Sequence, residues 1–167
     1  KPMAGLEARF ALAPAQPPLV QVTGPAGAAP PAQPADAVYG PLRLLGYDMQ
    51  PAGEQVEVIL HWQVSEPLAG DYTTTVQLFD AGGEKVAQDD RPPGGDFYPT
   101  SLWKPGEVLL DRHMLILTPG AQPARLLLGM YSGPEATLLA PLLEIPQVAS
   151  EYSCTNSQSA RRCSEPW

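Results

Sequence analysis

The sequence predicts an all-β protein built as an antiparallel β-sandwich of the immunoglobulin-like or jelly-roll-like kind. From residue 38 onward the chain divides into short apolar runs separated by Pro and Gly turns, which is the pattern of sandwiches and barrels. The clearest run alternates apolar and polar residues, which is the period of a strand. The 21 Pro and 15 Gly among 167 residues also disfavour long helices. The length allows one domain with an ordinary core.

The first 37 residues have the composition of a linker. Residues 1–41 contain nine Pro and eleven Ala, a composition that buries too little apolar surface to offset the entropy of ordering the chain. We therefore expect residues 1–37 to be a Pro/Ala-rich, extended segment. One exception is Leu19–Thr23, where apolar and polar residues alternate before a Gly-Pro pair. This stretch is a candidate edge strand for a neighbouring sheet.

Gln55–Val64 is the clearest predicted strand of the sandwich, which is expected to span residues 38–147. Successive strand side chains point to opposite faces, so the apolar residues at the even positions from 56 to 64, including Trp62, share one face. We expect that face to be buried. Glu57, His61 and Gln63 share the opposite face.

A hairpin is predicted next along the chain. Tyr72–Asp80 repeats the alternation, and the turn sequence Asp80-Ala-Gly-Gly-Glu84 supplies residues that tolerate positive φ. A second strand is expected at Lys85–Asp89. Together with Gln55–Val64, these segments are expected to form consecutive strands.

Two further apolar runs, Val108–Leu117 and Ala124–Tyr131, have lengths that fit either a strand or a buried helix. Pro-Gly or Gly-Pro pairs flank them and leave no room for helix caps, so we predict strands. Leu138–Ile145 is predicted to be the last strand. Because Pro141 interrupts it and has no N–H to donate, we place this strand at a sheet edge.

Residues 148–167 form a polar, Ser-rich tail that contains both cysteines of the chain, Cys154 and Cys163. Two cysteines this close together can form a local disulfide loop, which would suit an oxidising compartment. Two exposed thiols are the alternative. A zinc site is not expected, because no His and no second pair of cysteines lies nearby.

Charge and hydropathy exclude two kinds of interaction. The net charge of −8 and the pI of about 4.6 mean that the chain repels phosphate backbones, so no nucleic-acid partner is expected. No run of roughly 18 apolar residues is present, so we expect no transmembrane segment in this chain.

No enzyme motif is present in the sequence. There is no Gly-x-Ser-x-Gly elbow, Walker loop, GxGxxG, HExxH or EF-hand pattern. The two histidines, His61 and His113, lie inside predicted strands, and we interpret them as ordinary residues of a solvent face rather than as catalytic bases. Carboxylates at glycosidase spacing occur by chance in an acidic chain. We predict that the protein is not an enzyme and has no cofactor.

The densest group of carboxylates and aromatic rings lies in a long loop at residues 88–107. Its candidate ligand-binding residues are Asp89, Asp90, Asp96, Tyr98 and Trp103. The rings can stack on sugar faces while the carboxylates accept hydrogen bonds from sugar hydroxyls. Alternatively, the carboxylates and backbone carbonyls hold a calcium ion. In a third, purely structural interpretation, the rings pack the loop against the open end of the sandwich and the carboxylates cap backbone N–H groups.

Several motifs resemble one known kind of domain. They are Leu42-Arg-Leu-Leu-Gly-Tyr-Asp48, Leu60-His-Trp-Gln63, Asp71-Tyr-Thr73, Val76-Gln-Leu-Phe-Asp80, Val86-Ala-Gln-Asp-Asp90, Tyr98-Pro-Thr-Ser-Leu-Trp-Lys-Pro-Gly-Glu107, Asp111 and Leu128-Gly-Met-Tyr131. In that order they resemble the C-terminal, extracytoplasmic β-sandwich accessory domain of bacterial mannosyltransferase-type membrane glycosyltransferases and related envelope proteins. The resemblance covers about residues 40–146.

This resemblance implies a location but no catalytic residue, because the catalytic residues of that family belong to a membrane domain. It implies an extracytoplasmic site, with the domain tethered through a larger protein or complex. We therefore expect a non-catalytic accessory or assembly module of a bacterial envelope protein, whose partner is an envelope protein or a glycan. Two alternatives stay open: a carbohydrate-binding module that uses the 88–107 loop, and a surface-filament subunit in which Leu19–Thr23 pairs with a neighbouring sheet.

Overall fold

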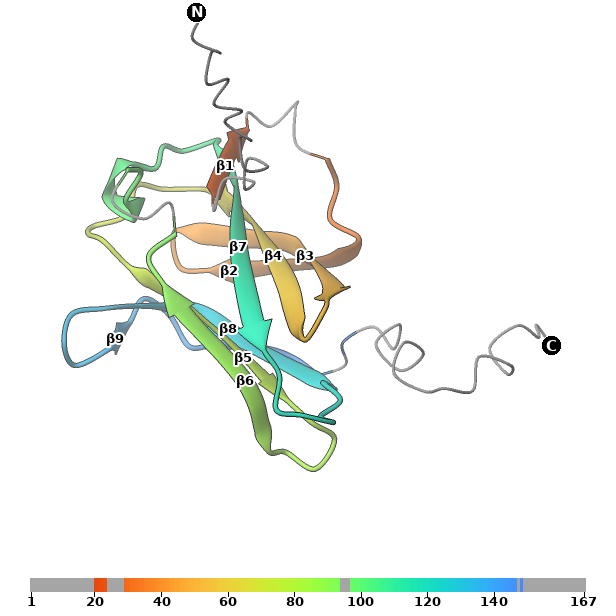
Figure 1. The fold of residues 1–167 in the computed structure, drawn as a ribbon. Helices are drawn as coiled ribbons and strands as arrows, with labels where there is room; N and C mark the ends of the chain where they lie inside the picture. Colours follow the sequence, from red (N-terminus) through yellow and green to blue (C-terminus); the bar gives the residue numbers. More distant parts are fainter. Residues whose placement is uncertain (1–19, 24–28, 94–96, 147, 149–167) are drawn as a thin grey trace, which may run out of the picture.

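The chain folds as the predicted all-β sandwich of two antiparallel sheets (Figure 1). The structure is a computed structural model that describes residues 20–23, 29–93, 97–146 and 148. Its elements are β1 (Val20–Thr23), β2 (Gln33–Tyr39), β3 (Leu42–Ala52), β4 (Gln55–Val64), β5 (Thr73–Phe79), β6 (Lys85–Arg91), the 3₁₀ helix η1 (Thr100–Leu102), β7 (Val108–Ile116), β8 (Arg125–Ser132), β9 (Thr137–Leu138) and β10 (Leu143–Ile145). Cys154, Cys163 and the proposed disulfide lie outside the described residues.

The chain passes from one sheet to the other three times. Sheet A has the order β1-β7-β4-β3-β2, and sheet B has the order β10-β8-β5-β6, with β9 paired to β8. The chain leaves sheet A after β4, returns after β6 and leaves again after β7. The β6–β7 connection therefore crosses from sheet B to sheet A, and β6 contacts β7. No helix in the described part of the chain is long and apolar enough to span a membrane.

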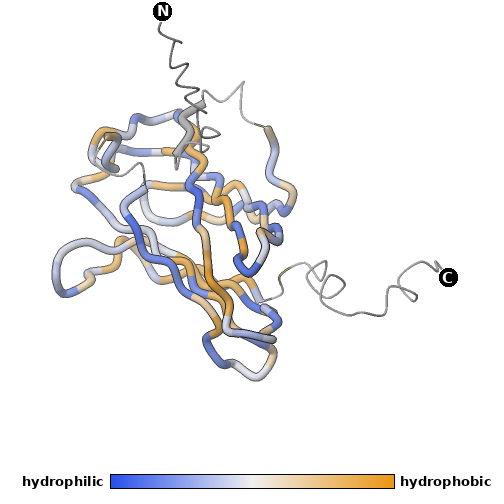
Figure 2. The backbone as a smooth tube through the Cα atoms, in the orientation of Figure 1, coloured by the Kyte–Doolittle hydropathy of each residue, from blue (hydrophilic) through white to orange (hydrophobic). Residues whose placement is uncertain are grey.

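The core lies between the sheets and follows the predicted alternation. The even-numbered residues of β4 from Val56 to Val64, with Trp62 among them, are all buried, which confirms the predicted inward face. Alternating residues of β5 and β8 face them from sheet B. Figure 2 shows hydrophobic stretches along the strands and hydrophilic residues at the hairpin turn after β5. The turn itself is closed by the Asp80 N–H, which donates to the Glu84 carbonyl at 2.9 Å.

The strand boundaries differ from the predicted ones at both ends of the sandwich. β2 begins at Gln33, inside the predicted linker. The sequence prediction missed this strand because its Ala and Pro residues hide the alternation of apolar and polar positions. Pro34 is tolerated there because β2 is the edge of sheet A. The predicted last strand is divided into β9 and β10, with Pro141 between them, and both lie at the edge next to β8. β1 matches the candidate edge strand and pairs with β7.

Gly46 allows the start of β2 to lie against β3. The register of β3 against β4 shifts between Leu44 and Gly46, so the strand is bulged at this point. A Cβ atom on Gly46 would lie 2.3 Å from the carbonyl oxygen of Gln33 and 2.6 Å from the Pro31 side chain. No side chain fits there unless the backbone of β2 moves.

We expect Gly46→Ala to lower the free energy of unfolding by on the order of 1–3 kcal/mol, because the new methyl group overlaps a backbone carbonyl that cannot rotate away. Urea denaturation measures this loss. Gly70→Ala is the matched control, since a Cβ on Gly70 meets open space, and its effect should stay within about 0.5 kcal/mol. Equal urea midpoints for the two variants would contradict the prediction.

Candidate functional site

A group of charged side chains lies inside the sandwich, and we call it the interior charge cluster: Asp89, Arg91, Asp111 and His113. On β7 the inward-facing residues include Asp111 and His113, and both are 0% exposed. Asp89 and Arg91 come from β6 of sheet B and are mostly buried. Charged residues are rarely buried unless they are paired, so their partners determine what this cluster can do.

The cluster joins the two sheets. The Asp89 carboxylate of sheet B accepts a hydrogen bond from His113 Nδ1 of sheet A at 2.8 Å. The same oxygen accepts from Arg91 Nε at 2.7 Å. The other ring nitrogen, His113 Nε2, lies 3.2 Å from Asp111 Oδ2. Because both ring nitrogens face carboxylates, the imidazole carries two protons and donates to each side.

The pKa values follow from these contacts. Burial lowers the pKa of His113, but the charges and hydrogen bonds of Asp111 and Asp89 outweigh it and raise the pKa to about 9. Burial raises the pKa of Asp89, but His113 and Arg91 outweigh it and hold the pKa below its ordinary value. His113 is therefore protonated at neutral pH and has no lone pair with which to accept a proton. The cluster can clasp the sheets together, but it cannot act there as a general base.

The expectation that both histidines lie on a solvent face is wrong. His113 faces the core, and His61 is also buried, with its Nε2 atom 2.7 Å from Asp48 Oδ2. The signal for His113 was present in the sequence: Asp111 and His113 are two residues apart and share one face with Leu109. The second partner of His113, however, is Asp89 from the other sheet, and strand alternation alone does not show it.

The two candidate rings of the 88–107 loop, Tyr98 and Trp103, pack against the protein. Trp103 is 2% exposed and belongs to the core, and its Nε1–H donates to the Tyr98 carbonyl at 3.2 Å. The Tyr98 hydroxyl donates to Glu107 Oε2 at 2.7 Å. Burial, followed by this contact with Glu107, raises the pKa of Tyr98 to about 12. These contacts match the structural interpretation of the two rings, and the Trp103 ring has no free face on which a sugar could stack.

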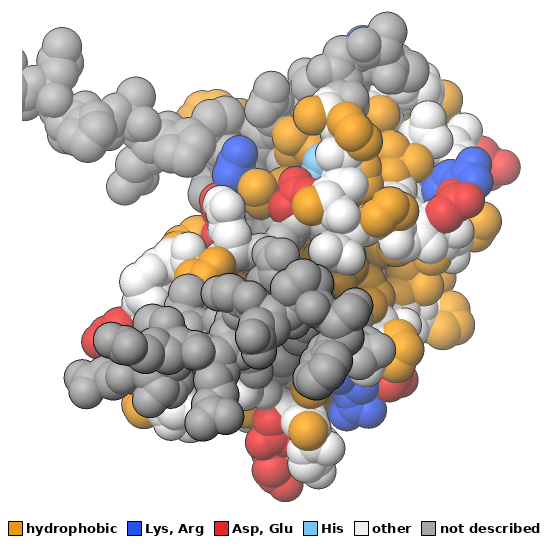
Figure 3. All heavy atoms as spheres, turned by 90° about the vertical axis from the view of Figure 1, so that its right-hand side faces the viewer, with side chains coloured by type: hydrophobic (Ala, Val, Ile, Leu, Met, Phe, Trp, Pro, Cys, Tyr) orange, Lys and Arg blue, Asp and Glu red, His pale blue; other side chains and the backbone are white. Residues whose placement is uncertain are grey.

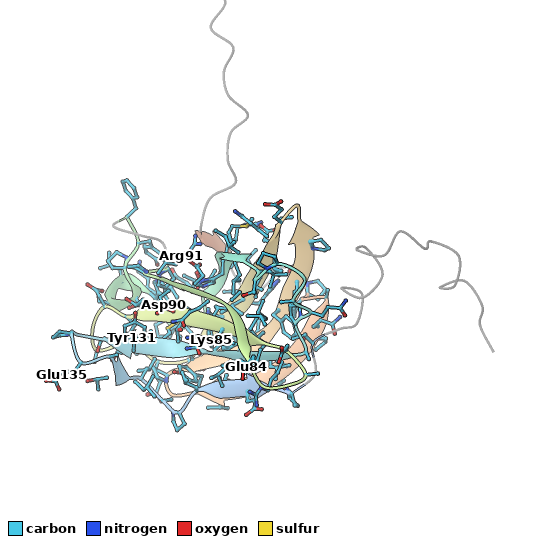
Figure 4. All side chains as sticks on the ribbon, turned by 60° about the horizontal axis from the view of Figure 1, so that its bottom comes forward. Glu84, Lys85, Asp90, Arg91, Tyr131 and Glu135 are labelled. Carbon is cyan, nitrogen blue, oxygen red and sulfur yellow. The ribbon has the colours of Figure 1, made fainter. Side chains whose placement is uncertain are left out.

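The predicted carboxylates do not converge on one site. Asp89 belongs to the interior charge cluster. Asp90 is exposed on sheet B, where it accepts hydrogen bonds from Gln88 Nε2 at 2.9 Å and from the Tyr131 hydroxyl at 3.4 Å (Figure 4). Asp96 lies outside the described residues. Within the described ranges no three His, Cys, Asp or Glu side chains are grouped so that they could hold a metal ion, and calcium binding stays a prediction.

The part of the loop around η1, residues 97–104, presents two apolar side chains on a braced support, and we call it the braced loop. Phe97 is 95% exposed and Leu102 is 54% exposed. The buried Trp103 holds one end, and the buried Thr100 hydroxyl donates to the Gly70 carbonyl at 2.9 Å and accepts from the Tyr72 N–H at 2.9 Å. Phe97 and Leu102 are not among the binding residues predicted from the sequence, because the sequence does not show which side chains of a loop are exposed.

A second apolar feature is a groove of about 320 Å³ between the edge strands β2 and β10. Its lining includes Ala35, Ala37, Tyr47, Leu143 and Ile145. Figure 3 looks onto the side that carries β2 and β3, and it shows hydrophobic side chains between scattered charged groups. No acid–base pair lines the groove, so its chemistry is that of apolar contact.

The pKa values of the interior charge cluster predict that the free energy of unfolding decreases at both high and low pH. The folded pKa of His113 lies above the unfolded value of about 6.5, so its contribution is complete below pH 6.5 and is lost as the pH rises through about 9. The folded pKa of Asp89 is lowered, so its contribution is complete above the unfolded pKa and is lost as the pH falls through the folded one. Urea unfolding between pH 5 and pH 10 should show an alkaline loss on the order of 3 kcal/mol.

The variant that checks this prediction is His113→Gln, which keeps a polar side chain but cannot titrate. It should be less stable than the wild type at pH 6 and should not show the alkaline loss. His61→Gln is the control and should keep it. An alkaline loss of the same size in His113→Gln would contradict the assignment.

We expect Trp103 and Phe97 of the braced loop to contribute very differently to the free energy of unfolding. Trp103→Ala should cost about 3–5 kcal/mol of unfolding free energy, because it leaves a cavity in the core. Phe97→Ala should change stability by less than about 0.5 kcal/mol, because the Phe97 ring lies in solvent. Thermal and urea unfolding of the two variants measure the difference. A similar loss in both would mean that Phe97 packs against the protein.

The comparisons with known proteins leave the site to be interpreted from its chemistry. No family model, no curated protein and no solved structure matches this chain. The resemblance to the glycosyltransferase accessory domain therefore stays a prediction.

Proposed function

We propose that this protein is a non-catalytic accessory or assembly module of an extracytoplasmic bacterial envelope protein, and that it contacts its partner through the braced loop. The observation that carries the proposal is the contrast within that loop: Trp103 and Thr100 are buried and fix the backbone, while Phe97 is almost fully exposed. An apolar ring held outside by a fixed backbone has the properties of an interface anchor.

The braced loop favours binding for two physical reasons. Exposed aromatic side chains that enter a pocket of a partner supply a large part of the binding energy of many interfaces. A loop whose shape is already fixed loses little conformational freedom on binding, so more of that energy appears as affinity. The hydrogen bonds of Thr100 to the β4–β5 connection and of Tyr98 to Glu107 provide this fixed shape.

The partner and the location in this proposal come from the sequence. The order of motifs resembles that of an extracytoplasmic accessory domain, and the two cysteines of the tail suit an oxidising compartment. The titratable groups that the structure buries most deeply, Asp111 and His113, are paired with one another. A role in binding uses the features that remain on the surface.

Carbohydrate binding is the second candidate, and one observation favours it. The Phe97 ring is free to stack on a sugar face, and the next residue, Tyr98, contacts the loop carboxylate Glu107. That carboxylate, however, already accepts hydrogen bonds from the Tyr98 hydroxyl and the Lys104 N–H. A glycan would have to compete for it, so the aromatic ring would supply most of the contact.

Photo-crosslinking tests the leading proposal. The full chain, expressed in its native cells with p-benzoylphenylalanine in place of Phe97, should form an adduct with an envelope protein, because the anchor enters the partner. The same probe at Val38, which is 76% exposed on β2, is the matched control and should give no adduct. No adduct from position 97, or equal adducts from both positions, would overturn the proposal.

Two parallel measurements separate the alternatives. Glycan-array binding by the wild type that disappears in Phe97→Ala would replace the leading proposal with the carbohydrate-binding module. Sedimentation velocity tests the filament alternative: concentration-dependent association of the wild type that Phe97→Ala abolishes would make a second copy of the chain the partner.

A further inference from the structure

Three polar atoms inside the sandwich have no hydrogen-bond partner among the residues that the structure describes. They are Trp62 Nε1, Thr74 Oγ1 and Asp111 Oδ1, and each belongs to a side chain that is 0% exposed. Buried polar atoms without partners are rare in native proteins, because each one costs about 1–3 kcal/mol. Three such atoms in one small core call for a common explanation.

Two of the three atoms belong to neighbouring strands of sheet A. In the register of β4 and β7, Trp62 lies opposite Leu109 and Asp111 lies opposite Leu60. Trp62 and Asp111 are therefore diagonal neighbours on the same inward face, within reach of long side chains. Their side chains, which carry an unpaired indole N–H and an unpaired carboxylate oxygen, therefore enter the core from adjacent positions.

Thr74 faces this part of the core from sheet B, and contacts on both sides fix its level. On one side it pairs with Arg91, which holds Asp89, and Asp89 in turn binds the His113 ring that contacts Asp111. On its other side, toward β8, Thr74 is connected to Trp62 through contacts of Met130 and Tyr39.

On that other side Thr74 pairs with Met130, whose N–H donates to the Tyr39 hydroxyl at 2.8 Å. The Tyr39 ring centroid lies 5.7 Å from that of Trp62. Two short series of contacts thus connect Thr74 to Asp111 and to Trp62, and from these we infer that the three residues lie at a similar level of the sandwich.

The hydrogen-bonding character of the three atoms selects the ligand. The indole N–H donates, the carboxylate oxygen accepts, and the hydroxyl does both. A cation would meet the N–H hydrogen and the nearby Arg91 and His113, and an anion would meet Asp111. An apolar molecule would leave all three atoms unpaired. Water can accept from Trp62, donate to Asp111 and exchange a hydrogen bond with Thr74.

We propose that Trp62, Thr74 and Asp111 form an internal water-binding site between the two sheets. The bound water supplies the second oxygen of Asp111 with a donor, and so completes the hydrogen bonding of the interior charge cluster. It also adds a connection between sheet A and sheet B, beside the contact between His113 and Asp89 and the contact between Tyr39 and Met130.

The direct test is a crystal structure of the full chain at about 1.5 Å resolution or better. We expect a water molecule within hydrogen-bond distance of at least two of the three atoms. A core without water between them, or direct hydrogen bonds among the three side chains, would overturn the proposal.

Oxygen-17 relaxation dispersion in solution, which counts long-lived internal waters, gives an independent test on the same chain. The double variant Trp62→Phe with Thr74→Val removes two of the partners and should lose the signal of one long-lived water relative to the wild type. Thr75→Val changes the adjacent residue, which faces the other way, and should keep the signal. Equal signals in the wild type and the double variant would also overturn the proposal.

Discussion

The hydrogen bond between Asp89 and His113 is the contact on which the rest of the structure depends. It joins β6 of sheet B to β7 of sheet A at the side of the sandwich where no strand pairing connects them. Apolar packing between the sheets has no direction, so it does not by itself fix their relative position. A charged pair with two defined partners does, and the Asp111 contact on the far side of the ring holds the imidazole in place.

The hydrogen bond between Asp89 and His113 also constrains the β6–β7 connection. The connection leaves sheet B just after Asp89 and Arg91, and it enters sheet A at β7 just before Asp111. With both ends held by the interior charge cluster and Trp103 buried between them, the chain is constrained at three points. Within this connection Thr100 and Trp103 are buried, whereas Phe97 and Leu102 are exposed. The buried cluster and the exposed anchor therefore belong to the same crossover.

The charge cluster and the proposed recognition role do not compete for residues. Catalysis needs titratable groups that substrate can reach and whose protons can move. Here the most strongly perturbed histidine is enclosed and held in one protonation state by two carboxylates. Recognition needs a surface of fixed shape, which the braced loop supplies. In this sandwich the interior ionisable groups are paired with one another, and the proposed contact with a partner uses an apolar side chain at the surface.

The sequence by itself determined the sandwich class, the buried face of β4 with Trp62, and the edge position of Leu19–Thr23 and of the strands around Pro141. These features follow from local rules, since alternation, turn residues and the missing proline N–H act within a few residues. The tertiary structure alone decided that His113 is buried between Asp89 and Asp111, and that Trp103 packs while Phe97 projects. The partner of a buried charge and the covered side of a loop come from another sheet, and no local pattern in the chain records which strands a crossover will bring together.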